Sequence, residues 1–298
     1  MSAAEPVTAA LLRKMPLPEH REGEDKNSRG RVLVIGGSTE VPGAAYLSGL
    51  AALRAGAGKL QLATVRSMVP HLAIAMPEAL VTGLAETPDG GIDPGEATRL
   101  AGRIAGVDAV VLGPGMMDAT AVASLTQRLL VEAEGSPAFV LDAEALVRLR
   151  DCRPALRRHA GCLVVTPHAG EMAGLLDIPK EQVKADPLGV ARQAAAMLGA
   201  VVVMKGGCSF IVSPQGQAWS CDQGNVGLAT SGSGDTLTGI IAALMARGAA
   251  PVVATLWGVF LHGEAGNRLA RAWGPVGYLA REIPAEVPQI MAQLAKGT

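Results

Sequence analysis

Aromatic residues are scarce in this chain of 298 residues, of which phenylalanine, tyrosine and tryptophan together make up 3%. Hydrophobic residues still account for 49%, so the core must consist mainly of aliphatic side chains packed around 37 glycines. No segment approaches the roughly 20 consecutive apolar residues that span a bilayer. The N-terminal apolar run is short and has its basic residues after it, an order that argues against a signal peptide.

Neither sign of charge is in clear excess. With 26 basic and 27 acidic residues the net charge is -1, which excludes a strong field for nucleic acid or anionic membranes. Small-molecule partners are therefore expected. The cysteines show no CxxC pair and no metal-ligand spacing with the histidines, so we expect no metal site from them and reduced thiols in the cytoplasm. These residues are Cys152, Cys162, Cys208 and Cys221.

Short apolar runs recur between helical stretches and predict a mostly parallel, doubly wound α/β sheet with helices on both faces. They cover residues 31–37, 59–65, 108–115, 138–146, 162–168 and 200–207. Residues 208–222 predict an antiparallel edge hairpin, and a long apolar helix is expected from about Pro251 to Trp273. We expect one domain over residues 1–298, with 1–29 as an N-terminal extension of it, and its first thirty residues as the most loosely held part.

The strongest motif is GSGDTLTGIIAALMARG at 232–248, which predicts a helix with one buried apolar face. Gly232 and Gly234 are expected just before this helix, where free backbone N–H groups could hold a phosphate. Asp235 at this helix start has two interpretations. It could cap the helix, or it could accept the proton of a hydroxyl that attacks a phosphoryl group.

Other polar residues follow predicted strands and should meet at one edge of the sheet. Lys205 could contact a nucleotide phosphate or could be a solvated turn lysine. His168 is more often a turn residue than a ligand, and Glu171 should open a helix. Asp142 could cap a helix or orient a ligand.

Several motifs, taken in order, resemble the ADP/ATP-dependent (S)-NAD(P)H-hydrate dehydratase family of the ribokinase-like superfamily. They are GRVLVIGGS (30–38), PGAA (42–45), AALRAGAGK (51–59), LGPG (112–115), LDAEAL (141–146), TPHAGE (166–171), KGG (205–207) and GNVGLATSGSGDTLTGII (224–241). The resemblance implies a three-layer α/β/α fold and a lyase that repairs hydrated NADH and NADPH. The hydrate hydroxyl would be phosphorylated by ADP or ATP with Mg²⁺, and phosphate would then be expelled.

The resemblance also implies roles for individual residues. Asp235 would be the catalytic base and would contact the hydrated cofactor together with Ala44, Gly115 and His168. The nucleotide would contact Lys205, Gly206, Gly207, Cys208, Ser209 and Gly234. Gly232, Asn225 and Glu171 would support them, and no protein residue is assigned to the metal. Three positions depart from the family pattern, namely Ser231, Ala169 and Glu144.

The resemblance further implies a homo-oligomer, with a tetramer favoured. Many relatives carry an additional epimerase domain, and a chain of this length leaves no residues for one. We therefore expect action on the S epimer alone. Two other functions remain open: a vitamin-precursor kinase of the same superfamily, and a nucleotide-binding sensor without catalysis. A stable phosphorylated product would favour the kinase.

Overall fold

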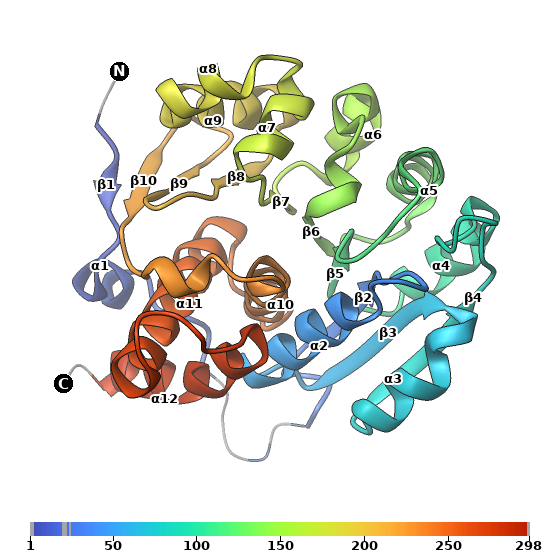
Figure 1. Ribbon diagram of the computed structural model, residues 1–298, viewed down its shortest axis with the longest axis horizontal. Helices are drawn as coiled ribbons and strands as arrows, with labels where there is room; N and C mark the ends of the chain where they lie inside the picture. Colours follow the sequence, from blue (N-terminus) through green and yellow to red (C-terminus); the bar gives the residue numbers. More distant parts are fainter. Residues whose placement is uncertain (1–2, 20–22, 24, 297–298) are drawn as a thin grey trace.

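The computed structural model of the chain describes residues 3–19, 23 and 25–296, and its central feature is one ten-stranded sheet (Figure 1). The remaining residues of the predicted domain and of its extension lie outside this description. The strands are β1 (Glu5–Pro6), β2 (Arg31–Ile35), β3 (Lys59–Val65), β4 (Ala79–Leu84), β5 (Ala109–Leu112), β6 (Ala138–Leu141), β7 (Leu163–Val165), β8 (Val201–Met204), β9 (Ser209–Val212) and β10 (Ala218–Cys221). Their order in the sheet is β1-β10-β9-β8-β7-β6-β5-β2-β3-β4.

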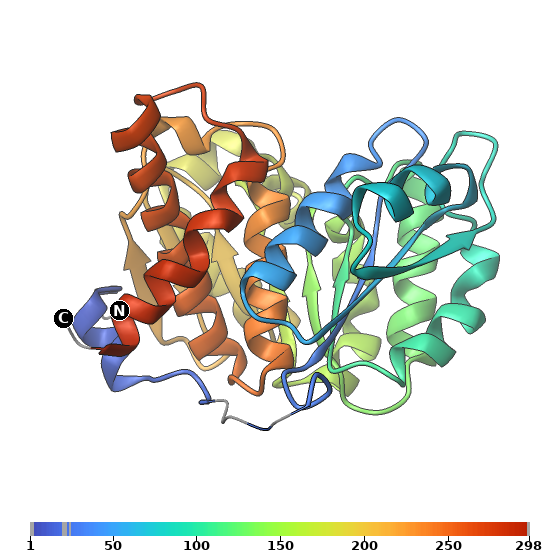
Figure 2. The ribbon, with the colours of Figure 1, turned by 90° about the horizontal axis from the view of Figure 1, so that it is seen from below.

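Helices cover both faces of this sheet. One face carries α2 (Gly43–Arg54), α3 (Val69–Ala75), α10 (Ser233–Ala246), α11 (Pro251–Trp273) and α12 (Ile283–Lys296), which lie in front of the sheet in Figure 2. The other face carries α4 (Ala97–Ile104), α5 (Ala119–Glu132), α6 (Arg153–Leu156), α7 (Ala169–Leu176), α8 (Lys180–Ala185) and α9 (Pro187–Leu198). The predicted α/β/α layering with a mostly parallel sheet is confirmed.

The alternation of side chains in β2 explains why its sequence is apolar throughout. Val32 and Val34 join the hydrophobic cluster under α2, α10 and α11, whereas Leu33 and Ile35 join the cluster under the opposite helices. Successive side chains of a strand point to opposite faces, so a strand covered on both sides needs apolar residues at every position.

The chain reverses its direction across the sheet between β2 and β5. From β2 it continues outward to β3 and β4, then returns to β5 on the other side of β2 and proceeds to β8. Ligands of such sheets bind outside the carboxyl ends of the strands at this switch point. The candidate site is therefore expected above β2 and β5 and their neighbours.

The predicted antiparallel hairpin is confirmed as β9 and β10, which pair from Ser209 with Cys221 to Val212 with Ala218. Its predicted place at the edge of the sheet is wrong, because β1 lies outside β10. The short strand β1 continues the sheet beyond it and pairs parallel to β10. Helix α11 has the predicted bounds, and most of its apolar side chains are buried inside the chain. No described helix is both long and apolar enough to cross a lipid bilayer.

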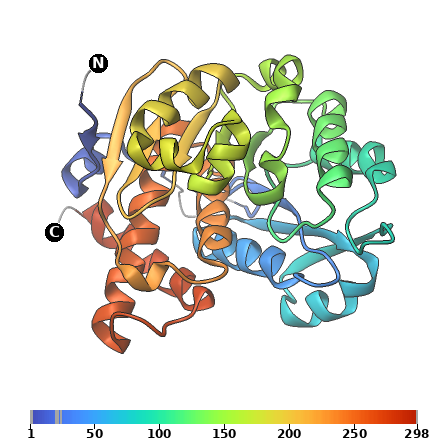
Figure 3. The same ribbon diagram turned by 45° about the horizontal axis from the view of Figure 1, so that its top comes forward.

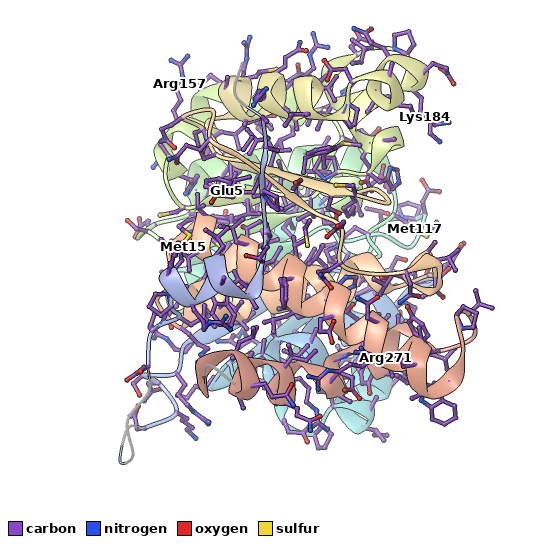
Figure 4. The ribbon with its side chains drawn as sticks, turned by 90° about the vertical axis from the view of Figure 1, so that its left-hand side faces the viewer. Glu5, Met15, Met117, Arg157, Lys184 and Arg271 are labelled. Carbon is purple, nitrogen blue, oxygen red and sulfur yellow. The ribbon has the colours of Figure 1, made fainter. Side chains whose placement is uncertain are left out.

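The prediction that the first thirty residues are loosely held is wrong for the segment around α1 (Ala9–Lys14). Val7 and Leu12 are buried in the main cluster, and the indole Nε1 of Trp257 donates a hydrogen bond of 2.8 Å to the backbone oxygen of Met15. Figure 4 views the end of the sheet where β1 and α1 lie, with Glu5 and Met15 labelled. The segment is held because α11 and α12 offer it an apolar surface, which position in the chain does not reveal.

Candidate active site

The start of α10 places Asp235 beside unpaired backbone donors. Gly232 is the N-cap residue in a left-handed conformation with φ 87°, so Asp235 is the third residue of the helix. Among the described hydrogen bonds, the N–H groups of Gly234 and Asp235 have no backbone acceptor. These donors and the positive end of the helix dipole suit an anion.

The capping interpretation of Asp235 is wrong. Its carboxylate does not cap the helix, because the N-cap is Gly232 and the cap has no side-chain hydrogen bond. Its own backbone oxygen accepts from the Ser48 hydroxyl at 3.0 Å and from the Thr238 hydroxyl at 2.8 Å, which fixes α10 against α2. The carboxylate is therefore free for another role.

A buried ion pair lies next to this helix start. Lys205 Nζ is 2.7 Å from Asp142 Oδ1 and 3.7 Å from Glu171 Oε2. The Thr166 hydroxyl donates to the same Asp142 oxygen at 2.7 Å. A Cβ added to Gly234 would lie 3.4 Å from Lys205 Nζ, so the ammonium group sits directly beside the unpaired backbone donors.

Sequence reasoning recognised Lys205 and Asp142 separately but missed their pairing and the part of Thr166. Lys205 follows β8 and Asp142 follows β6, and they meet across β7. The predicted interpretation of Asp142 as a helix cap is wrong, because its side chain makes no cap bond. Polar residues at the carboxyl ends of adjacent strands were the available signal.

The electrostatics of this cluster bring the pKa of Asp235 close to neutral pH. Burial raises the pKa of Asp235 to about 7, with a further increase from Asp142, a decrease from Lys205 and an increase from Glu171. Burial opposes the charge of Lys205, but Asp142, Glu171 and Asp235 outweigh it and raise the pKa of this lysine. A carboxylate that titrates near pH 7 beside a permanent cation is suited to act as a general base.

His168 and Glu171 form a capping box at the start of α7. His168 Nδ1 accepts hydrogen bonds of 3.0 Å from the N–H groups of Gly170 and Glu171, and Glu171 Oε2 accepts from the N–H of His168 at 2.7 Å. The His168 side chain is still 59% exposed. The interpretation of His168 as a turn residue is thus correct, since it caps α7, and its Nε2 lies 3.5 Å from Glu171 Oε1. Its contact with a ligand stays a prediction.

Ala44 and Gly115 meet at the switch point between β2 and β5. The N–H of Gly37 donates to the Pro114 oxygen at 2.7 Å, which joins the two loops. Gly115 has φ 64°, and a Cβ added there would lie 2.7 Å from the Cβ of Ala44. The next turn of α2 carries Ser48, which bonds to Asp235, so these loops border the same site.

The remaining predicted nucleotide residues form the connection from β8 to β9. Gly206, Gly207 and Cys208 are exposed, and Ser209 begins β9. Lys205 belongs to the same connection but turns inward to Asp142. This loop therefore borders the site on its β8 side.

Asn225 has a structural task. Its Oδ1 accepts from the N–H of Gly227 at 2.9 Å and from the Tyr278 hydroxyl at 2.9 Å, which ties the segment before α10 to the C-terminal part of the chain.

Sequence reasoning also missed His262, whose Nε2 lies 3.1 Å from the Ser233 hydroxyl and 3.0 Å from the Ser233 backbone oxygen. Burial lowers the pKa of His262 to about 4, so this ring is neutral and supports the first turn of α10.

The three departures from the family pattern surround these residues. Ser231 is exposed just before the N-cap, and Ala169 is the first residue of α7. Glu144 lies in the short 3-10 helix η3 (Ala143–Leu146), where burial and the neighbouring Glu171 raise its pKa. None of them replaces a residue of the Asp142, Lys205 and Asp235 cluster.

Figure 3 shows α10 at the centre of the molecule, with α2 and the helices α7 to α9 around it.

Comparison with known proteins connects this geometry to one family. A family model described as NAD(P)H-hydrate dehydratase matches residues 32–289. An ADP-dependent (S)-NAD(P)H-hydrate dehydratase of Xanthomonas campestris is 50% identical over 292 residues, which cover 98% of this chain and 97% of that protein. A bifunctional NAD(P)H-hydrate repair enzyme of Moorella thermoacetica is 38% identical over 97% of this chain, which spans 54% of that longer protein.

A solved structure shows the same fold. The ADP/ATP-dependent NAD(P)H-hydrate dehydratase of Bacillus subtilis, co-crystallised with ATP and Mg²⁺, superimposes with a TM-score of 0.81 at 27% identity. The superposition covers 98% of this chain and 99% of that one. A ribokinase-like superfamily protein of Enterococcus faecalis superimposes equally well, with a TM-score of 0.81 at 27% identity, so the ribokinase-like architecture expected from the sequence is confirmed.

Proposed function

Because the chain belongs to the NAD(P)H-hydrate dehydratase family, we propose that it returns the S epimer of hydrated NADH or NADPH to the reduced cofactor. ADP, or ATP in its place, serves as the phosphoryl donor. The observation that carries the proposal is the position of Asp235, which lies beside unpaired N–H donors and the Lys205 to Asp142 pair. Ala44, Gly115 and His168 border the space for the hydrated ring.

In this mechanism Asp235 accepts the proton of the hydrate hydroxyl as its oxygen attacks the terminal phosphorus of the donor. The N–H groups of Gly234 and Asp235 and the ammonium of Lys205 stabilise the charge on the transferred phosphoryl group. The ring nitrogen then expels phosphate as the C–O bond breaks, and loss of a proton from the adjacent ring carbon restores the double bond. With ADP the products are the reduced cofactor, AMP and phosphate.

Magnesium is a further part of the proposal. Within the described residues no group of three or more His, Cys, Asp or Glu side chains is arranged to hold a metal ion. Mg²⁺ takes many of its ligands from nucleotide phosphates and water, so it needs few ligands from the protein. Glu171 would hold it from the protein side, and the ion would neutralise the phosphates.

Assembly and location complete the proposal. We propose a homotetramer in the cytoplasm, with residues 1–298 as one domain. The four free cysteines are consistent with a reducing compartment. Size-exclusion chromatography with light scattering tests the assembly, and a monomer at micromolar concentration would contradict it.

The direct test is conversion of the hydrate. The protein, mixed with the S epimer of NADH hydrate, ADP and Mg²⁺, is expected to restore the near-ultraviolet absorbance of NADH and to release phosphate in equal amounts. The same mixture without nucleotide is the control and should remain unchanged. Accumulation of a stable phosphorylated product would instead favour a kinase, and nucleotide binding without any turnover would favour a sensor.

The pH dependence of this reaction follows from Asp235. A general base must be unprotonated, so kcat/KM for the hydrate is expected to fall as the pH drops through about 7. Asp142→Asn removes a negative charge that raises the pKa of Asp235, so the acidic limb should move to lower pH. Rate profiles between about pH 5 and pH 9 measure this. Glu78→Gln is the control, because Glu78 is exposed and distant in sequence from the site residues. An acidic limb that moves to higher pH in Asp142→Asn would contradict the assignment of Asp235 as the base.

A further inference from the structure

A large cavity adjoins the site on the side away from the β8 to β9 connection. Its volume is about 760 Å³, and His168 and Glu171 form one part of its wall. The opposite wall includes residues of η3, of the segment that follows it and of the next 3-10 helix, η4 (Leu149–Cys152). A cavity of this size suits a nucleotide-sized ligand.

Its position in the fold places it on the substrate side. η3 and η4 follow β6 and α7 follows β7, whereas the predicted nucleotide loop from Lys205 to Ser209 follows β8. Gly115 follows β5, the next strand beyond β6. The cavity thus lies between the strand ends that carry the predicted contacts to the hydrated cofactor, and the phosphoryl donor enters from the other side of His168.

The backbone around the cavity is under unusual strain. Four non-glycine residues in the described part of the chain have positive φ, and three of them line this cavity. They are Ala143 with φ 49°, Arg148 with φ 57° and Asp177 with φ 57°. For alanine and arginine, left-handed backbone is unfavourable and persists where the surroundings hold it, often at binding sites. At Asp177 it is the ordinary end of α7, since Asp177 is the C-cap residue of that helix.

The charged groups of the wall leave one cation without a partner. Arg150 pairs with Asp177 at 3.4 Å, and Glu171 is engaged by Lys205 and by the N–H of His168. The guanidinium of Arg148 is exposed and forms no hydrogen bond or ion pair with any described residue. Asp151 remains as an exposed carboxylate beside it.

We propose that this cavity holds the adenylate half of the hydrated dinucleotide, with the guanidinium of Arg148 on one of its phosphate groups. The inference rests on the proposed function, which sets the nicotinamide ring between Asp235 and His168. A dinucleotide is much longer than its reacting ring, and His168 is one of the residues that line this cavity. Arginine binds phosphate oxygens through two parallel N–H donors, and Asp151 can accept from ribose hydroxyls.

Arg148→Gln tests the inference with three substrates: the hydrates of NADPH, of NADH and of reduced nicotinamide mononucleotide, which lacks the adenylate half. We expect KM to rise roughly 10- to 100-fold for a dinucleotide hydrate. kcat for every substrate and KM for the mononucleotide hydrate should remain unchanged. If KM rises for NADPH hydrate alone, the 2′-phosphate is the partner of Arg148. If KM rises for both dinucleotide hydrates, the partner is the diphosphate bridge.

Arg153→Gln is the matched control, because Arg153 is an exposed arginine of the same segment that does not line the cavity. Equal KM values for wild type and Arg148→Gln with every substrate, or an equal loss with all three, would overturn the inference. Calorimetric binding of NADP⁺ and NAD⁺ gives a second readout that needs no turnover. Failure of the wild-type protein to convert any hydrate would instead refute the proposed function, and the two outcomes are thus separable.

Discussion

Replacement of Asp235 by asparagine is expected to lower kcat/KM for the hydrate by roughly 10²- to 10⁴-fold. Asparagine has nearly the same shape but cannot accept the hydroxyl proton. The unpaired N–H groups at the start of α10 and the Lys205 ammonium remain, so ADP should still bind. Steady-state rates with the hydrate and calorimetry with ADP measure the two effects.

Glu78→Gln is again the control for loss of a carboxylate, and it should leave both quantities unchanged. Turnover of Asp235→Asn near the wild-type rate would refute the base assignment. Loss of ADP binding together with turnover would show that Asp235 holds the nucleotide rather than the proton.

The same substitution should make the fold more stable at alkaline pH. The pKa of Asp235 is about 7 in the folded chain, against an ordinary value of 3.8, so the folded state binds more protons between these values. Stability therefore falls as the pH rises from about 4 to about 7, and the charged carboxylate costs roughly 1–4 kcal/mol above that range. Thermal unfolding at pH 8 should show Asp235→Asn melting higher than wild type, and the difference should vanish near pH 4. A variant that melts lower than wild type at pH 8 would contradict the destabilising effect of the charged carboxylate.

Gly239→Ala is expected to destabilise the fold by roughly 2–5 kcal/mol. Gly239 lies on α10 where this helix crosses α2, and a Cβ there would stand 2.0 Å from the backbone oxygen of Ser48. A backbone atom cannot move aside as a flexible side chain can, so the two helices must separate. Because Ser48 bonds to the backbone of Asp235, activity should fall as well. Urea unfolding followed by circular dichroism measures the change.

Gly102→Ala provides a control with the opposite sign. Gly102 is exposed on α4, and an added Cβ there would meet no atom within 4 Å. Alanine in a helix is favoured over glycine by roughly 0.5–1 kcal/mol, so this variant should be slightly more stable than wild type. Equal effects of the two substitutions would show that helix propensity, rather than the crossing of α2 and α10, determines the result.

The sequence revealed the elements whose pattern is determined by burial on both faces. β2, β5, β6 and β8 are apolar at almost every position, and the long helix α11 was predicted with its observed bounds. β4 was missed, because Leu80 is half exposed at the margin of the sheet and Gly83 interrupts the apolar run. The division into domains stays a prediction.

The candidate site could be predicted only as a set of separate strand ends. Asp235, Lys205 and His168 each lie within a recognisable motif. No local sequence pattern indicates that Lys205 pairs with Asp142, which is 63 positions away. The neutral state of His262 is equally hidden, because its partner Ser233 lies 29 positions earlier and burial sets its charge. Such pairings depend on the order of the strands in the sheet and on how deeply each side chain is buried. Neither can be inferred from a short segment of sequence.

The capping box at α7 has a consequence for what His168 can recognise. Since Nδ1 accepts two backbone N–H groups, the proton of the neutral ring resides on Nε2, and this tautomer is set by the backbone rather than by a ligand. The Nε2–H of this tautomer is a donor, and Nε2 lies 3.5 Å from Glu171 Oε1. In the proposed mechanism this edge of the ring would therefore meet an acceptor oxygen such as that of a carboxamide, and proton abstraction would be left to Asp235.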